Sequence, residues 1–308
     1  MWQIAVLERK ERTTMEYGVT HTHTHTQVLK MNFRLRPRLP LPSRSGTIDD
    51  MLSGCTYTLP SYTFEDGTTL KKVDVRYNTF GEMNATKDNI VVVCHALTGN
   101  AAVDTWWTGM VGAGCSIDTD KYMVVCANVL GSCYGSCGPM SVNPETGQQY
   151  GRDFPAVTIR DTVAVHSLML KDGLGVHAVA CVVGGSMGGM PALEWTFVAT
   201  VPVRAAVVLS TGGRHTPWQI GMSELQRQAI YADPKFKEGA YDPADPPNSG
   251  LAVARQIAMV SYRTHNSYFT KFGRREQETP SIIESGLARY TYSKIQGFSS
   301  KFFEYKDL

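Results

Sequence analysis

A serine flanked by glycines is the stretch of this chain best suited to chemistry. The apolar residues 178–183 lead into the sequence Gly-Gly-Ser-Met-Gly-Gly-Met at residues 184–190. Gly184, Ser186 and Gly188 fit the pattern G-x-S-x-G, in which glycines let a strand and a helix approach closely while the serine hydroxyl stays exposed on a tight turn. The pattern favours a nucleophile elbow, with Ser186 as the nucleophile, over a glycine-rich turn with an incidental serine.

A second loop supplies the other half of the expected chemistry. The apolar residues 90–94 lead into the sequence His-Ala-Leu-Thr-Gly at residues 95–99. We expect the backbone N–H groups of Leu97 and of Met187, the residue after the serine, to stabilise a developing oxyanion. His95 adjoins this loop, but a catalytic triad built on such an elbow runs serine, acid, histidine along the chain. A structural role for His95 is therefore favoured over a catalytic one.

The elements that must position these residues alternate between strands and helices. Residues 57–62 and 73–78 predict an antiparallel hairpin around a turn at 65–67, and residues 158–170 predict a helix with Asp161 in its first turn. Buried parallel strands are predicted at residues 90–94, 122–127, 179–183 and 205–209. The fold class is α/β, with a mostly parallel sheet flanked by helices.

Composition narrows the class of partner. The 308 residues are 43% hydrophobic and carry a net charge of +2, so the chain has enough apolar material for a sizeable core. The sequence contains no polybasic stripe of the kind that binds nucleic acid, and its apolar runs are too short to span a membrane. We expect a soluble protein that acts on small molecules.

The cysteines indicate a reducing compartment. Their number, seven, is odd, and several lie in predicted core strands, so buried free thiols are favoured over a disulfide framework. Cys133 and Cys137 lack the second pair or the spaced histidines that a zinc site would need, although redox or zinc chemistry there stays an alternative. The sequence predicts no metal site and a cytoplasmic location.

Residues 1–50 differ from the rest of the chain. Threonine and histidine alternate over residues 21–26, and arginines then occur among prolines and serines. This composition predicts a disordered N-terminal extension rather than a histidine metal site. The short apolar run at residues 4–7 does not support a secretory signal, and an organellar presequence remains an alternative.

Longer motifs carry a resemblance to a known family. The glycine-rich loop at residues 128–139 follows a predicted strand, and Trp106-Trp107 form either a pocket wall or core packing. Together with the elbow and the 95–99 loop, the chain resembles the homoserine O-acetyltransferase family of α/β-hydrolase-fold acyltransferases over residues 55–275. The further motifs are FPAVTIRD (154–161), LEW (193–195), QRQAIYADP (226–234), GLAVAR (250–255) and KFGR (271–274).

The resemblance implies a reaction and two substrates. Family members acetylate the serine from acetyl-CoA and pass the acetyl group to the hydroxyl of L-homoserine, a step toward methionine, so Ser186 is the implied acyl carrier. Acetyl-CoA is a co-substrate, and no cofactor is held permanently. Arg255 in GLAVAR matches the arginine that binds the substrate carboxylate, a role suited to a guanidinium. Without that context, a helix-surface arginine is the alternative. Arg227 is the weaker case, with a structural role favoured.

The resemblance also implies a domain organisation. Residues 51–210 are the expected α/β-hydrolase core, and residues 211–308 are an incomplete helical lid that keeps bulk water from the acyl-enzyme. The family forms homodimers through its lid helices, so a homodimer is implied, although the sequence alone leaves the oligomeric state open.

The chain departs from the family at its C-terminal end. The acidic residue and the histidine of the triad follow two further core strands in the family, and residues 275–308 show neither those strands nor the Gly-His-Asp motif. We therefore expect a C-terminally truncated form without the last core strands. A catalytically inactive α/β-hydrolase-like binding protein is the alternative function, because a serine without an adjacent base is a poor nucleophile. A serine or homoserine succinyltransferase is another, since the sequence does not fix donor or acceptor.

Overall fold

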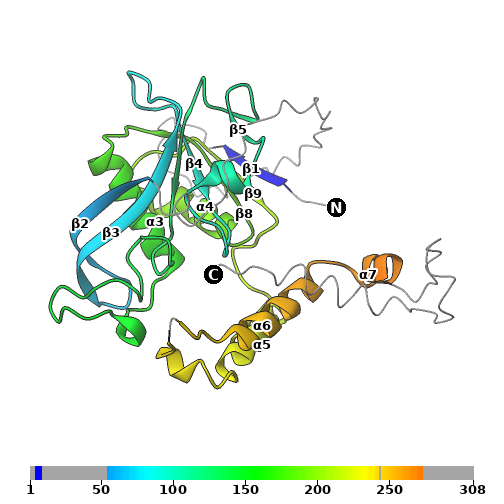
Figure 1. Ribbon diagram of the computed structural model, residues 1–308. Helices are drawn as coiled ribbons and strands as arrows, with labels where there is room; N and C mark the ends of the chain where they lie inside the picture. Colours follow the sequence, from blue (N-terminus) through cyan, green and yellow to red (C-terminus); the bar gives the residue numbers. More distant parts are fainter. Residues whose placement is uncertain (1–3, 9–53, 243, 273–308) are drawn as a thin grey trace, which may run out of the picture. The chain divides into compact units, whose positions relative to one another are not determined.

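A computed structural model describes residues 4–8, 54–242 and 244–272 of this chain. The chain divides into two compact units, Met1–Gly213 and Arg214–Leu308, and each is described by itself. Figure 1 shows the first unit as a sheet with helices and the second as helices. The expected core at 51–210 and the expected lid region at 211–308 stay predictions.

The first unit is built on a mixed sheet of seven strands in the order β1-β9-β8-β4-β7-β3-β2. The pairs β7–β4, β4–β8 and β8–β9 are parallel, and the pairs of β1, β2 and β3 are antiparallel. The strands are β1 (Ile4–Glu8), β2 (Cys55–Thr63), β3 (Thr69–Phe80), β4 (Ile90–Cys94), β7 (Met123–Ala127), β8 (Val179–Gly185) and β9 (Ala205–Leu209); β5 (Val111–Gly112) and β6 (Ile117–Asp118) form a small separate sheet. The predicted hairpin and all four predicted parallel strands are confirmed.

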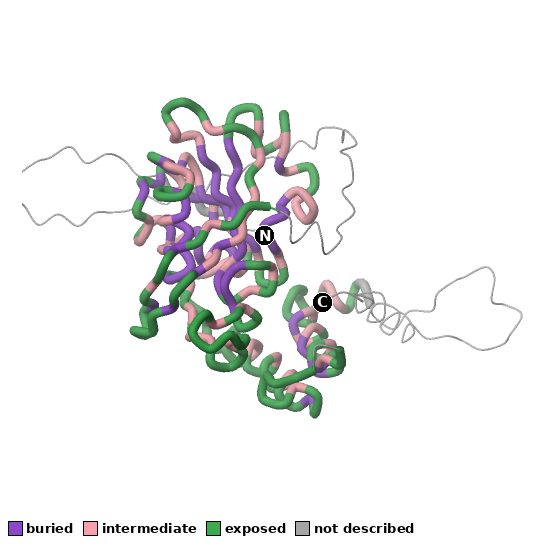
Figure 2. The backbone as a smooth tube through the Cα atoms, turned by 60° about the vertical axis from the view of Figure 1, so that its left-hand side comes forward, coloured by how far each residue is buried: buried purple, intermediate pink, exposed green. Residues whose placement is uncertain are grey.

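The central strands are buried on both faces, as the near-continuous apolar runs predict. Ile90 and Val92 of β4 belong to one core cluster, while Val91 and Val93 belong to a second cluster with Val103. Figure 2 shows the buried residues concentrated in these strands. Because successive side chains of a strand point to opposite faces, the alternation builds two cores from one strand.

Helices cover the two faces of this sheet. α3 (Ile159–Leu168) and α4 (Gly189–Val198) pack beside the first cluster, and α2 (Val103–Trp106) lies beside the second. Thr158 and Asp161 form a reciprocal capping box at the start of α3, so the predicted helix at residues 158–170 is confirmed. The remaining helical segments of this unit are the 3₁₀ turns η1 (Gly151–Asp153) and η3 (Ser186–Gly188) and the π-helix η2 (Met169–Gly173), which continues α3.

The predicted disorder of residues 1–50 is wrong for the five residues of β1. Ile4–Glu8 lies within the stretch expected to be disordered, yet it pairs antiparallel with β9, with Ile4 opposite Leu209. An apolar segment can add to a sheet edge because the edge strand presents unpaired N–H and C=O groups. The rest of the predicted extension, residues 1–3 and 9–50 with the histidine repeat, lies outside the described residues.

The second unit begins with a helical hairpin. α5 (Pro217–Tyr231) and α6 (Asn248–Ser261) pack against each other, and η4 (Lys237–Gly239) and α7 (His265–Phe272) complete its described elements. α5 starts with a second capping box, between Thr216 and Gln219, and carries Pro217 at its first position. The described part of α5 has no buried residue, whereas α6 buries Gly250, Ala254 and Ala258.

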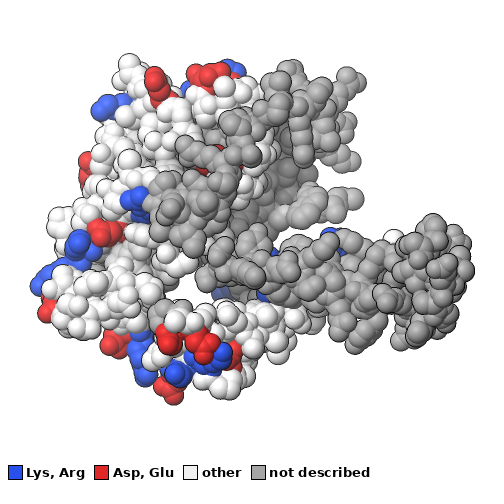
Figure 3. Space-filling model, in the orientation of Figure 1, with Lys and Arg blue, Asp and Glu red and all other residues white. Residues whose placement is uncertain are grey.

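None of the helices in the described ranges combines the length and the apolar character that crossing a bilayer requires. On the face drawn in Figure 3, basic and acidic side chains are interspersed over the described residues. Several charged side chains of the described residues form ion pairs, among them Lys71 with Glu145 and Arg204 with Asp88.

Candidate active site

Ser186 stands at the turn between β8 and α4 in a strained conformation. Its φ is +56°, in the left-handed region that a non-glycine residue enters only at a cost. The residue is exposed and opens the single 3₁₀ turn η3, which leads directly into α4. Strand, strained serine and helix follow one another as a nucleophile elbow requires.

The glycines around Ser186 are required by contact between backbones. A methyl group on Gly184 would lie 1.9 Å from the carbonyl oxygen of Gly188, and one on Gly188 would lie 2.1 Å from the carbonyl oxygen of Cys94. No side chain fits at such separations. The G-x-S-x-G spacing therefore records how closely the end of β8, the start of α4 and the end of β4 pack together.

The loop after β4 lies beside this elbow. Cys94 is paired in register with Gly184, so residues 95–99 and the Ser186 turn leave neighbouring parallel strands at the same edge of the sheet. Leu97 is 74% exposed, and no described residue accepts a hydrogen bond from its N–H. Met187 is in the first turn of a helical segment, where N–H groups lack an intrahelical acceptor. Their convergence on an oxyanion stays a prediction.

His95 is held as a neutral, structural histidine. Its Nδ1 is 2.8 Å from the Ala96 carbonyl oxygen, and its Nε2 accepts a hydrogen bond of 3.1 Å from the N–H of Val129. Burial lowers its pKa, because a charged imidazole is poorly solvated there. Both ring nitrogens are engaged away from Ser186, which agrees with the structural role that the order of the triad favours.

No catalytic base is found beside Ser186 among the described residues, since none of them hydrogen-bonds to its hydroxyl. His166 is buried and donates from Nε2 to the Asn128 carbonyl oxygen at 3.1 Å. His177 precedes β8 and therefore lies at the opposite end of that strand from Ser186. The other two described histidines, His215 and His265, belong to the second unit.

Arg255, the predicted carboxylate ligand, is on α6 in the second unit. Its Nη1 donates a hydrogen bond of 3.1 Å to the Tyr262 hydroxyl, and its guanidinium lies 5.8 Å from the centre of the same ring. No described carboxylate forms an ion pair with it. Arg227, by contrast, pairs with Glu224 on α5, which supports the structural role expected for it.

The tryptophan pair contributes to the core of the first unit. Trp106 and Trp107 are half-buried against the second core cluster, with ring centres 5.5 Å apart. The indole N–H of Trp106 donates to the Asn100 carbonyl oxygen at 2.9 Å. Of the two readings that the sequence left open, core packing is the one that these contacts support.

Sequence reasoning missed the role of Asn128, a fully buried residue directly after β7. Its side-chain oxygen accepts from the Ala101 N–H at 2.6 Å, and its carbonyl oxygen accepts from the Ser136 hydroxyl at 2.7 Å. Its carbonyl also accepts from His166, so one residue joins the segment after β4, the glycine-rich loop and α3. An asparagine directly after an apolar strand is the signal that could have found it.

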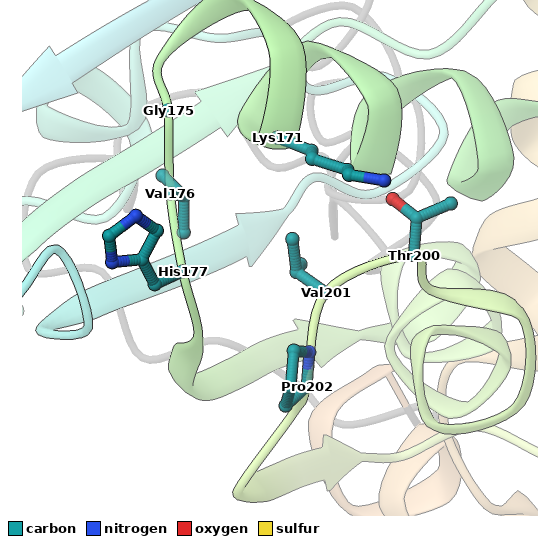
Figure 4. A pocket seen from close by; sticks show the side chains of 7 residues that line it. All are labelled: Lys171, Gly175, Val176, His177, Thr200, Val201 and Pro202. Carbon is teal, nitrogen blue, oxygen red and sulfur yellow. The ribbon is translucent and has the colours of Figure 1, made fainter.

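A hollow of about 310 Å³ is remote from this chemistry. Lys171, His177 and Thr200 line it together with apolar residues (Figure 4). These residues precede β8 and β9, so the hollow lies at the amino ends of the strands, whereas Ser186 follows the carboxyl end of β8. It is no part of the candidate active site.

The described thiols and carboxylates form no metal site. No group of three or more histidine, cysteine, aspartate or glutamate side chains is placed to hold a metal ion within the described ranges. The seven cysteines, all in those ranges, are free thiols. Burial raises the pKa of Cys94 to about 12, which keeps that thiol protonated at neutral pH.

Comparison with known proteins decides the family. A family model described as the alpha/beta hydrolase fold matches residues 89–301. A homoserine O-acetyltransferase of Salinibacter ruber is 51% identical over 253 residues, which make up 80% of this chain and 72% of that protein. The chain belongs to the homoserine O-acetyltransferase family. The chain covers 72%, 60% and 68% of the lengths of three homoserine O-acetyltransferases that it matches.

Solved structures confirm the α/β-hydrolase fold of this family member. The homoserine O-acetyltransferase of Bacillus anthracis aligns with a TM-score of 0.64 at 27% identity, covering 81% of this chain and 70% of that one. Esterase E22 aligns with a TM-score of 0.63 at 25% identity, covering 81% of this chain and 73% of that one. A transferase and an esterase fit the backbone about equally well, so the sequence relationship, not the fold, separates the two activities.

Proposed function

We propose that this chain takes part in the homoserine O-acetyltransferase reaction, with Ser186 as the residue that carries the acetyl group. The observation that carries this proposal is the exposed, strained serine on a glycine-flanked elbow, in a chain 51% identical to a homoserine O-acetyltransferase. A serine held in this way presents its hydroxyl to a carbonyl carbon without side-chain rearrangement.

The reaction consists of two acyl transfers. In the first, Ser186 Oγ forms a bond to the acetyl carbonyl carbon of acetyl-CoA, the carbon–sulfur bond breaks, and CoA leaves as its thiol with the proton from the serine. In the second, the hydroxyl oxygen of L-homoserine forms a bond to the acetyl carbon, the bond between that carbon and Ser186 Oγ breaks, and the proton of the homoserine hydroxyl passes to Ser186 Oγ. Each step passes through a tetrahedral oxyanion, which the N–H groups of Leu97 and Met187 would stabilise.

Arg255 is the proposed ligand of the homoserine carboxylate. Its guanidinium contacts the phenol of Tyr262 and no described carboxylate, so its charge is not already neutralised by an ion pair in the described part of the chain. A guanidinium binds a carboxylate through two parallel hydrogen bonds, which would orient the amino acid as well as hold it.

Both substrates bind transiently in this proposal, and no permanent cofactor is required. Transfer of an acetyl group to homoserine is a step of methionine biosynthesis, and the cytoplasm is the proposed location, since free thiols suit a reducing compartment. A homodimer is also proposed. Exposed apolar side chains of the second unit, among them Trp218 and Val253, supply surface that an association could bury.

Mass spectrometry of the acylated protein tests this function. Purified chain incubated with labelled acetyl-CoA should gain one acetyl group on the peptide that contains Ser186, and Ser186→Ala should abolish this gain. Ser210→Ala is the matched control, because Ser210 is also an exposed serine with a positive φ, +49°, directly after the neighbouring strand β9. An unmodified wild-type chain would refute the proposal and favour a binding protein without catalytic activity.

Competition between acceptors and donors identifies the substrates. Loss of the label to L-homoserine, in preference to L-serine or water, would separate the transferase from a serine acyltransferase and an esterase. Replacing acetyl-CoA by succinyl-CoA tests the donor in the same assay. Arg255→Lys keeps the positive charge but loses the planar fork, so we expect a higher KM for homoserine, by about tenfold, with acylation of Ser186 unchanged.

A further inference from the structure

The peptide group between Ala96 and Leu97 is fixed from its carbonyl side. The Ala96 carbonyl oxygen accepts two hydrogen bonds, one from His95 Nδ1 and one from the N–H of Gly99, both at 2.8 Å. In a planar trans peptide the C=O and the following N–H point in opposite directions. Fixing the direction of the Ala96 oxygen therefore fixes the direction of the Leu97 N–H.

The side chain of Leu97 gives this peptide little support. Leu97 is 74% exposed, so packing of its own side chain cannot define the orientation of the peptide plane. Of the two donors to Ala96, the Gly99 amide belongs to the same short turn and moves with it. His95 is the donor that is anchored elsewhere, since its ring is 1% exposed and is bonded beyond the loop.

The hydrogen bond from Val129 also determines which ring nitrogen of His95 carries the proton. The Val129 N–H can only donate, so His95 Nε2 must present its lone pair, and the ring proton of the neutral histidine is then on Nδ1. Nδ1–H is the donor that the Ala96 oxygen needs. Val129 follows β7, the strand paired with β4, so the tautomer is imposed from outside the loop that it orients.

Reversing the Ala96–Leu97 peptide would replace a hydrogen-bond donor by an acceptor at the carboxyl edge of the sheet. Rotating the Ala96–Leu97 group by half a turn would present a carbonyl oxygen where the N–H now points, and an acceptor there would repel an oxyanion instead of stabilising it. The reversal would also break both hydrogen bonds to the Ala96 oxygen. The Nδ1–H bond thus opposes the conformation that is wrong for acyl transfer.

We propose that His95 is a positioning residue for acyl transfer, which keeps the Leu97 N–H directed for oxyanion stabilisation by holding the Ala96 carbonyl oxygen through the Nδ1–H tautomer. The inference rests on the proposed function, in which Leu97 is an oxyanion donor. It adds a catalytic reason for a buried histidine that is neither nucleophile nor base.

The tautomer is tested on the intact wild-type chain without any assay of activity. Protein labelled with ¹⁵N-histidine should show His95 as the Nδ1–H tautomer at neutral pH, with Nε2 coupled through a hydrogen bond to the Val129 amide. An Nε2–H tautomer would overturn the proposal. A correct tautomer in a chain that never acetylates Ser186 would instead refute the proposed function and leave the peptide-orienting role of His95 standing.

Three variants separate the two ring nitrogens. His95→Phe keeps a ring but neither hydrogen bond, His95→Asn keeps a donor near the Nδ1 position, and His95→Gln keeps an acceptor near the Nε2 position. We expect the Phe variant to lower kcat for acyl transfer about a hundredfold with KM nearly unchanged. Asn should recover most of that loss, and Gln should recover little.

Structures of the variants give the second readout. In His95→Phe that melts cooperatively, the Ala96–Leu97 peptide should be reversed or present in two orientations, whereas His95→Asn should show the wild-type orientation. A Phe variant with an unchanged peptide, or a kcat that Gln restores better than Asn, would overturn the proposal. If the Phe variant does not fold, the comparison of Asn with Gln decides the outcome.

Discussion

The carboxyl edge of the sheet and the helical hairpin of the second unit are built in different ways. At the edge, backbones meet directly, and a single methyl group on Gly184 or Gly188 would lie about 2 Å from a carbonyl oxygen. In the hairpin, α5 buries no residue in its described length and carries exposed apolar side chains such as Trp218. Figure 2 shows the same contrast between buried strands and largely exposed helices.

The difference separates two kinds of functional residue. The properties of Ser186 come from the backbone, namely from its strained φ and from the close backbone packing at Gly184 and Gly188. No substitution of a distant side chain would replace these features. Arg255 takes its properties from its own side chain, on a helix surface with one phenol as partner. We therefore expect the first site to be sensitive to small changes of packing and the second to changes of side-chain chemistry.

The largest expected effect contrasts a glycine from each region. Gly188→Ala should lower the free energy of unfolding by about 3 kcal/mol or more, because its methyl group would overlap the carbonyl oxygens of Cys94 and His95. Gly221→Ala, in α5, has open space around the new methyl group and should raise helix stability by about 1 kcal/mol. Urea unfolding measures both, and equal effects would contradict the contrast.

A smaller effect tests the buried histidine of the first unit. Burial, with a contribution from His95, lowers the pKa of His166 from 6.5 to about 4, so the unfolded chain binds more protons than the folded chain between those pH values. Stability should therefore decrease as pH falls from about 6.5, by about 3 kcal/mol once pH 4 is reached.

His166→Gln provides the control for this pH dependence. Glutamine keeps an N–H that can donate to the Asn128 carbonyl oxygen but does not titrate. The variant should lose much of the decrease in stability between pH 6.5 and pH 4, as measured by unfolding at each pH. A variant with the wild-type pH dependence would show that other groups cause it.

The smallest effect concerns the hairpin of the second unit. The Asp233 carboxylate accepts hydrogen bonds from the N–H of Gly250 at 2.8 Å and of Lys235 at 2.9 Å, and these bonds lower its pKa. Asp233→Ala should raise the hydrogen-exchange rate of the Gly250 amide about tenfold. Asp245→Ala, which removes only an exposed ion pair with Lys235, should leave that rate nearly unchanged.

The lowered pKa of Asp233 makes the strength of its contact with Gly250 depend on pH. Because the folded-state pKa of Asp233 is below its ordinary value, its stabilising contribution is present above that value and is lost as pH falls through the folded-state pKa. The protection factor of the Gly250 amide, which compares its exchange rate with the intrinsic rate at the same pH, should then decrease under acidic conditions in wild type and not in Asp233→Ala. Protection of the Gly250 amide that does not depend on Asp233 would contradict this account of the hairpin.

Periodic and local signals were readable directly from the sequence. The apolar runs predicted β4, β7, β8 and β9, and Thr158 with Asp161 marked the start of α3, because strand burial and helix capping depend on neighbouring residues. The glycine spacing likewise predicted the elbow at Ser186. Each of these features depends on a few consecutive residues.

Contacts between remote segments were not readable in that way. Asn128 joins Ala101, Ser136 and His166, and no pattern in the sequence pairs these positions. The strand at Ile4–Glu8 was missed because a low-complexity environment predicts disorder, whereas pairing depends on an available sheet edge. QRQAIYADP and GLAVAR were recognised as motifs, but the bond from the Gly250 N–H to Asp233 that links them was not.

The sequence by itself determined that Ser186 is a nucleophile candidate on a strand–turn–helix, since glycine spacing and apolar runs are local constraints. Only the tertiary structure decided what surrounds it. The close approach of Gly188 to Cys94 and the tautomer of His95 both come from neighbouring strands that are far apart in sequence. Hydrogen-bond direction is a property of two groups in space, so it exists only once the chain has folded.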